Sequence, residues 1–318
     1  MTLFLVRRLA VLALTLGLAS LAVFAVLELL PGNAAQLMLG ATATPEAVAA
    51  LEARLGLDRP PAARYADWVL GLLQGRTGIS HFYDTPSSEL IAERLAVSLP
   101  LAVIAMALTA AALAMGVYAA SRHRRAGDIG MMAVSQIGLS IPNFWLAILL
   151  ILLFAVKLQW VGAGGFPGWR EADGGGLRAG LAALLLPAVA LAAVQAAILA
   201  RVTRSAVLEA MHEDFVRTAR AKGLSRRAVL WRHVLRNAMI PVLTVMGLQF
   251  ANLLTGTIVV ENVFVLPGIG RLVFQAIANR DLPLVRDVVM LLAAAVVLVN
   301  FAVDLLYALV DPRLRVRA

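Results

Sequence analysis

Side chains that could do chemistry are scarce in this chain of 318 residues. It has four histidines and no cysteine, and the histidines do not show the His-Glu-x-x-His spacing of a helical zinc site. No Gly-x-Ser-x-Gly elbow for a nucleophilic serine occurs. Lys157 and Lys222 do not follow a glycine, so no lysine sits in a phosphate-binding loop. We therefore expect no catalytic residue, no metal site and no cofactor in this chain.

The most polar stretch of the second half runs from Glu209 to Arg236, between long apolar segments. Residues 206–221 are good helix formers without Gly or Pro, which predicts a helix there. Gly223 suits the left-handed residue that ends a helix, and Ser225 can cap the next helix. Two charged helices between apolar segments indicate contact with a partner in water. The alternative is a solvated, arginine-rich connector that fixes topology.

The sequence of this stretch resembles the cytoplasmic loop of ABC-importer permeases, in the dipeptide, oligopeptide and nickel branch. The likeness rests on Glu-Asp-Phe-Val-Arg-Thr-Ala-Arg-Ala-Lys-Gly-Leu at 213–224 and on His-Val-Leu-Arg-Asn-Ala-Met-Ile-Pro, which ends at Pro241. Arg217-Thr218-Ala219 stands where the general family motif has Glu-Ala-Ala, and the Pro is displaced, as in that branch.

The resemblance implies a coupling helix that docks on a separate ATPase subunit, within a loop at about 204–237. Phe215, Ala219 and Leu224 would then supply packing contacts, and Gly223 the turn. The complete set of coupling residues that the resemblance implies is Glu213, Asp214, Phe215, Arg217, Thr218, Ala219, Lys222, Gly223 and Leu224.

The composition is that of a membrane protein. Hydrophobic residues make up 61% of the chain and charged residues 15%, and the mean hydropathy is +0.85. The net charge of +9 lies mostly in short loops beside apolar segments, where membrane topology accounts for it. Aromatic residues are not interleaved with a basic face, which argues against a nucleic-acid partner.

Six apolar segments are long enough to cross a bilayer. The first, at 9–30, exceeds the ~7–15 apolar residues of a cleaved signal peptide, so we expect a retained span. The others are predicted at 96–121, 131–156, 181–203, 238–260 and 286–310, with kinks expected at Pro142, Pro187 and Pro241. The sequence thus predicts an all-α membrane protein with six transmembrane helices.

Residues 31–95 form a separate, amphipathic segment. Thr44-Pro45-Glu46 predicts a helix start, and Gly56 a helix end. A second helix from Pro61 carries a stripe that we interpret as packed on neighbours or lying at the membrane interface, namely Tyr65, Trp68, Val69, Leu72 and Leu73. Loops are predicted at 157–180 and 261–285 from their Gly and Pro. We expect three parts: a first span at 1–30, this external segment at 31–95, and a five-helix core at 96–318.

The basic residues predict the orientation. Most of the 28 Lys and Arg residues lie at the two termini, at 122–125 and at 201–236. Because short basic loops stay in the cytoplasm, both termini and the Glu209–Arg236 stretch are predicted to be cytoplasmic.

Polar residues within the spans are candidates for a passage. An ion-coupled carrier would show ionisable groups in mid-span, and here Asp304 lies in the last span while Glu28 and Glu261 lie near span ends. Neutral polar groups either hold helices together or line a passage for a polar solute. The candidates for the passage are Gln136, Ser140, Asn143, Gln195, Gln249, Asn252, Asn300 and Asp304.

The resemblance extends along nearly the whole chain. It includes Leu-Gly-Leu-Asp-Arg-Pro at 55–60, Ser-Ile-Pro-Asn-Phe-Trp at 140–145, Glu-Asn-Val-Phe at 261–264, Leu-Pro-Gly-Ile-Gly-Arg at 266–271 and Val-Asp-Pro-Arg-Leu-Arg at 310–315. It implies a type I (MetI-like) permease in the bacterial cytoplasmic membrane. The implied partners are a homologous second permease, which suggests a heterodimer, two ATPase subunits that use ATP and Mg, and an external solute-binding protein.

The function predicted from this resemblance is ATP-driven import of peptides or a related solute, such as a nickel chelate or glutathione. Two alternatives stay open. A self-contained, ion-coupled secondary transporter would need no ATPase, and a structural membrane scaffold would bind partners without moving a solute.

Overall fold

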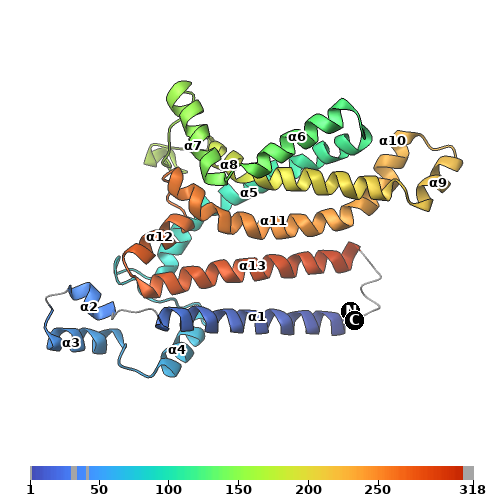
Figure 1. The fold of residues 1–318 in the computed structure, drawn as a ribbon. Helices are drawn as coiled ribbons and strands as arrows, with labels where there is room; N and C mark the ends of the chain where they lie inside the picture. Colours follow the sequence, from blue (N-terminus) through green and yellow to red (C-terminus); the bar gives the residue numbers. More distant parts are fainter. Residues whose placement is uncertain (1, 30–33, 41–42, 311–318) are drawn as a thin grey trace.

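The computed structural model describes residues 2–29, 34–40 and 43–310. Its described part is almost entirely helical, with one isolated antiparallel bridge between Ile79 and Pro86 (Figure 1). The predicted all-α fold is confirmed. Among the described residues, five helices are long and apolar enough to span a bilayer: α1 (Thr2–Leu29), α5 (Ser87–Ser121), α8 (Leu177–Ala210), α11 (Leu235–Val263) and α13 (Leu282–Val310).

The sixth predicted span is bent instead of straight. Helix α6 (Ala126–Ser140) and α7 (Asn143–Leu150), which continues as a π-helical turn (Ile151–Lys157), meet at 101°. Ile141 is extended at the break, with φ −98° and ψ 119°. Because Pro142 disfavours helical dihedrals in the residue before it, the helix breaks there. The kink expected at Pro142 is therefore confirmed, and the span predicted over 131–156 is a pair of helices bent at this residue.

The core consists of α5, α8 and α11, which pack against one another. Leu101, Leu184, Leu191 and Leu253 are fully buried among them. Gly116 allows α5 and α8 to approach closely. A Cβ at this position would lie only 2.5 Å from the carbonyl oxygen of Ala200. Small residues at such a contact allow the van der Waals packing that holds membrane helices together. Helix α1 lies apart from this core, beside α13 (Figure 1).

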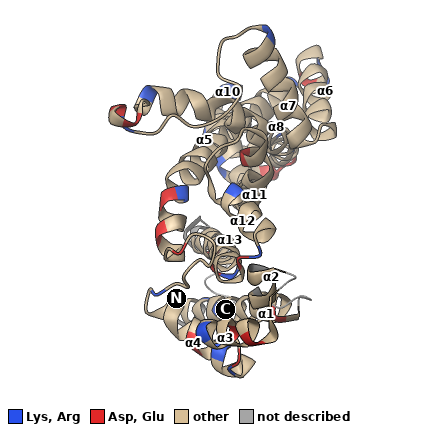
Figure 2. Cartoon of the chain, turned by 90° about the vertical axis from the view of Figure 1, so that its left-hand side faces the viewer, with Lys and Arg blue, Asp and Glu red and all other residues tan. Residues whose placement is uncertain are grey.

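The amphipathic segment forms α2 (Ala34–Leu39), which was not predicted, and the two predicted helices, α3 (Pro45–Leu55) and α4 (Pro61–Leu73). The Thr44 hydroxyl accepts a hydrogen bond from the amide of Ala47 at 3.3 Å, and Gly56 ends α3 with φ +68°. Trp68 is buried and stacks on Phe24 of α1. The stripe of α4 therefore packs on neighbouring helices at Trp68. In Figure 2 the ribbon of α3 and α4 carries both acidic and basic positions, whereas the long spans are mostly uncharged.

Two buried carboxylates at the start of α13 hold the segment that follows α4. Asp287 accepts hydrogen bonds from Trp68 Nε1 and from the amide of Gly78, both at 2.8 Å. Asp281 accepts from the Ser80 hydroxyl and from the amide of His81, the latter at 3.2 Å. Burial lowers the pKa of His81 below its ordinary value, although the nearby Asp281 opposes the shift.

A helix, α12 (Ile269–Ala278), occupies the region 261–285 that was predicted to be a loop. Side chains outside α12 cap its first backbone amides. The Glu261 carboxylate accepts a hydrogen bond from the amide of Gly270 at 2.7 Å, and the Ser98 hydroxyl accepts one from the amide of Ile269 at 2.8 Å. Ser98 in turn donates to Glu261 at 2.5 Å. The Pro and Gly at 267–270 therefore mark the tight entry into a short helix and not a loop throughout. The predicted loop at 157–180 is confirmed between Lys157 and Leu177, where a short 3-10 turn (Glu171–Asp173) lies, but its last residues already belong to α8.

Different helices lie at the two ends of the molecule along the direction of the long helices. The start of α1, the end of α13 and the α9–α10 region lie at one end, whereas α2, α3, α4 and α12 lie at the other (Figure 1). This arrangement agrees with the predicted topology, in which both termini and the Glu209–Arg236 stretch share one side of the membrane.

We predict that Gly270→Ala destabilises the chain. A Cβ at this position would lie 2.2 Å from the Cα of Ile258, and a backbone atom has little freedom to move aside. Overpacking of this kind costs about 1–3 kcal/mol. The measurement is the melting temperature of the purified protein in detergent. Gly130→Ala is the matched control, since no atom lies within 4 Å of its added Cβ, and it should melt at or above the wild-type temperature.

Candidate coupling site

The polar stretch begins at the end of α8 and contains α9 (Asp214–Ala221) and α10 (Arg226–Val229). The helix predicted over 206–221 is broken, because α8 ends at Ala210 and Glu213 is extended, with φ −69° and ψ 151°. No Gly or Pro marks this break. The cause is tertiary: the turn at 211–213 redirects α9 so that Val216 can be buried against the ends of the spans.

Helix α9 has one face inside the subunit and one in solvent. Val216 and Ala219 are 1% and 5% exposed and pack in a cluster with Val207 and Val229. On the other face, Asp214 and Arg217 form an ion pair at 3.5 Å, with side chains 94% and 81% exposed. An exposed pair of this kind contributes little stability, so the buried face is what holds α9 in place.

The end of α9 is a hydrogen-bonded reversal of the chain. Gly223 adopts φ +79°, its amide donates to the carbonyl of Arg220 at 2.9 Å, and the amide of Leu224 donates to the carbonyl of Ala219 at 3.3 Å. These two bonds are the Schellman arrangement, which requires a left-handed residue and favours glycine. Ser225 then caps α10 by accepting from the amide of Ala228 at 3.3 Å. The predicted roles of Gly223 and Ser225 in this turn are confirmed.

The predicted coupling residues are brought together on this one loop, but they do not share one environment. Ala219 is buried and Phe215 is partly buried against the same cluster. The remaining residues are exposed: Glu213, Asp214, Arg217, Thr218, Lys222, Gly223 and Leu224.

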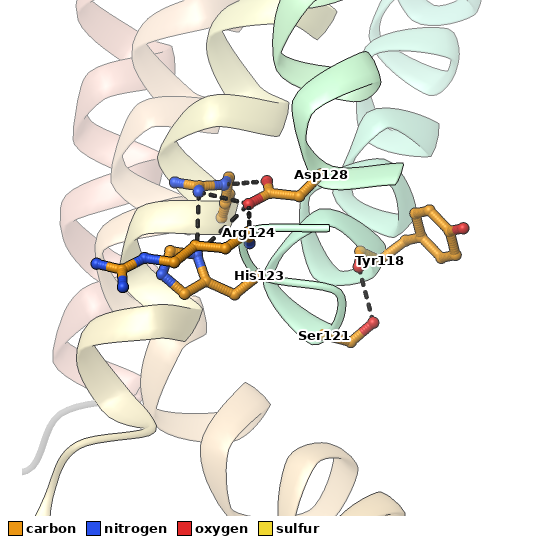
Figure 3. Close-up of polar contacts among 6 residues, drawn as sticks. Tyr118, Ser121, His123, Arg124 and Asp128 are labelled. Atoms are coloured by element: carbon orange, nitrogen blue, oxygen red, sulfur yellow. Dashed lines mark hydrogen bonds and ion pairs between the residues drawn. The ribbon is translucent and has the colours of Figure 1, made fainter. Parts of the chain in front are cut away.

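A buried ion pair braces the turn that precedes α6 against α8 (Figure 3). The Asp128 carboxylate is 3% exposed. It accepts hydrogen bonds from Arg204 Nε at 2.5 Å, from Arg204 Nη2 at 2.8 Å and from the backbone amide of Arg124 at 2.9 Å. His123 Nδ1 lies 3.2 Å from Arg204 Nη2. In the same turn, the Ser121 hydroxyl donates to the carbonyl of Tyr118 at 2.7 Å. Sequence reasoning missed this pair because its partners are far apart along the chain, although an acid directly after the basic run at 122–125 was a visible signal.

The predicted passage residues are dispersed in the structure. Gln195 and Gln249 are buried and join α8 to α11, since Gln249 Nε2 donates to the carbonyl of Gln195 at 2.9 Å. Asp304 forms an ion pair with Arg8 of α1. Asn143 is partly buried at the start of α7. The others lie on exposed surfaces of α6, α11 and α13: Gln136, Ser140, Asn252 and Asn300.

Within the residues that the structure describes, no group of three His, Asp or Glu side chains is placed to hold a metal ion.

Comparisons with known proteins identify the family. Residues 112–316 match the family described as "Binding-protein-dependent transport system inner membrane component", and residues 1–99 match the family that describes the N-terminal part of the membrane component of such systems. The chain belongs to this permease family. The permease is therefore a multi-pass membrane subunit of a bacterial ABC importer.

Relatives cover the permease almost completely. A protein named putative peptide transport system permease, from Brucella abortus, is 41% identical over 316 residues, 99% of each chain. A di/tripeptide transport system permease from Pseudomonas aeruginosa is 40% identical over 98% of each chain. A glutathione transport system permease from Salmonella choleraesuis is 38% identical over 98% of each chain.

A solved structure shows the same fold. The inward-facing methionine ABC transporter MetNI aligns with a TM-score of 0.57 at 19% identity, over 70% of this permease and 97% of that chain. The predicted MetI-like core is confirmed by this likeness.

We predict that Gly223→Val loosens the loop and exposes it to protease. No atom lies within 4 Å of an added Cβ, so the effect comes from φ +79°, which costs L-residues about 1–2 kcal/mol. Such a cost raises the fraction of molecules in which this loop is locally unfolded about 5- to 30-fold. Trypsin should therefore cleave at Arg217, Arg220 and Lys222 faster by a similar factor. Gly223→Asn is the control, because Asn tolerates this conformation, and equal cleavage of the Val and Asn variants would contradict the prediction.

Proposed function

We propose that this permease moves peptides, or a related solute such as a nickel chelate or glutathione, and that α9 couples it to separate ATPase subunits. The observation that carries the proposal is the geometry of α9. It is a short helix anchored by one buried face at the ends of two spans, with its polar face free for a partner in water. The names of the relatives support the solute class.

The loop is built to transmit a push to the spans. Residues Arg226–Val263 form one continuous helical segment of 38 residues, which includes α10, a π-helical turn (Leu230–Val234) and α11. Helix α8 enters the loop from the other side, and α9 packs against both through Val216 and Ala219. A displacement of α9 by closing ATPase subunits therefore reaches two spans at once. The different contacts of α9 in the two states are what would shift the conformational equilibrium.

The family supports the remaining partners. We propose a homologous second permease subunit, two ATPase subunits that bind ATP and Mg, and an external solute-binding protein. The α9 end of the molecule, with both termini, faces the cytoplasm, and the segment 31–95 faces outward beside the five-helix core. Exposed polar residues of the spans line the passage between the two permeases, namely Gln136, Ser140, Asn252 and Asn300, whereas Gln195 and Gln249 hold α8 to α11.

The energy source separates this proposal from an ion-coupled carrier or a scaffold. We predict that the complete transporter in proteoliposomes accumulates a labelled dipeptide or glutathione when ATP is supplied on the α9 side, in the presence of the solute-binding protein. An imposed proton or sodium gradient without ATP should give no accumulation. Uptake driven by the gradient alone would support the carrier, and no uptake under either condition, across a panel of peptides, would support the scaffold.

A crosslink tests the coupling contact directly. The chain has no native cysteine, so a single introduced thiol is unique. We predict that Thr218→Cys, on the exposed face of α9, forms a disulfide with a cysteine placed on the ATPase subunit, and that its yield changes with nucleotide. Ala219→Cys is the matched control, because that position is only 5% exposed and should react little. Equal yields at both positions would place the contact elsewhere.

A further inference from the structure

A basic pocket lies where the turn after α5 meets the end of α8, α9 and α10. Its volume is about 480 Å³, within the range of sites that bind small molecules. None of its lining residues, as far as the structure describes them, is acidic. The ionisable side chains that line it are Arg122, His123, Arg125, His212, Arg220 and Arg226.

The positive charge of this pocket is not neutralised within the subunit. Over the described ranges, the guanidinium groups of Arg122, Arg125, Arg220 and Arg226 make no ion pair and no hydrogen bond. Asp128, which follows the turn at 122–125, is already held by two nitrogens of Arg204 and one backbone amide. Four converging cations repel one another, so an anion bound among them would remove that repulsion.

The position of the pocket relative to the apolar parts of the helices indicates which anion is available to bind there. The apolar part of α5 runs to the end of that helix at Ser121, directly beside Arg122 and Arg125 of the pocket, whereas the last turns of α8 before Ala210 already carry charged residues. On α6, next to the same turn, Ile129 and Val134 are 66% and 60% exposed, as expected for side chains that face lipid or another membrane helix. The pocket therefore lies where the apolar interior of a bilayer gives way to headgroups, and headgroups carry phosphate.

We propose that this pocket binds the phosphate group of an anionic phospholipid. Arginine is suited to this ligand because its planar donors match phosphate geometry in pairs. The pocket joins the turn at 122–125 to Arg220 of α9 and Arg226 of α10, so a bound headgroup ties the candidate coupling loop to the α5–α6 turn. We place this lipid in the cytoplasmic leaflet, which rests on the proposed orientation, whereas the phosphate chemistry does not depend on it.

The test measures lipid retained by the intact transporter complex. The complex is stripped of lipid in detergent, incubated with equal amounts of phosphatidylglycerol and phosphatidylcholine, and the lipid that co-purifies is quantified by mass spectrometry. Arg122→Gln with Arg226→Gln removes two pocket charges. Arg232→Gln with Arg236→Gln is the matched control, since both arginines are exposed in the same stretch but do not line the pocket.

We expect the pocket variant to bind phosphatidylglycerol about fivefold more weakly per arginine removed, with phosphatidylcholine and the control variant unchanged. Equal retention by wild type and pocket variant would overturn the proposal. If inorganic phosphate in excess displaces the lipid and binds the stripped complex equally well, the lipid source is wrong and the ligand is a soluble phosphate. If the pocket variant loses ATPase subunits and keeps its lipid, the pocket is an acidic partner's docking site. Lipid retention is measured without transport, so its failure is distinct from a failure of the proposed function.

Discussion

Four buried carboxylates must be hydrogen-bonded for this fold to exist. Asp128, Glu261, Asp281 and Asp287 are each 3% exposed or less, and most of the other buried side chains are apolar. A buried charge without partners is far more costly than any single packing contact. Each carboxylate meets donors from a segment distant in sequence, so satisfying it fixes where that segment lies.

These carboxylates connect some elements by buried hydrogen bonds and leave others without such a connection. Asp281 and Asp287 fix the turn after α4 on α13, and Glu261 fixes α12 on the end of α11, all at the end opposite α9. Asp128 fixes the turn before α6 on α8. Helix α9 has no such anchor among the described contacts and is held by apolar packing alone. It can therefore shift with the ends of α8 and α11 without breaking a buried charge pair.

The sequence predicted what depends on local pattern. Apolar length located the spans, and the Gly223 turn and the Thr44 and Ser225 caps followed from residue chemistry at single positions. The missed features depend on contacts between distant segments. The break at 211–213 contains no Gly or Pro, and α12 is hidden among turn residues because its cap comes from Glu261 and Ser98. The sequence predicted the bend at Pro142, but it could not predict the bend angle, which depends on packing around this residue.

The burial of Ala219 changes the kind of contact that α9 can offer. The apolar side chains of α9 are used inside the subunit, so a partner would meet charged and polar groups together with the partly exposed Leu224. Charged groups at an interface contribute register and discrimination more than raw affinity. In the proposed coupling, the exposed polar face of α9 therefore supplies register to the partner, while the buried apolar face holds the helix against the ends of the spans.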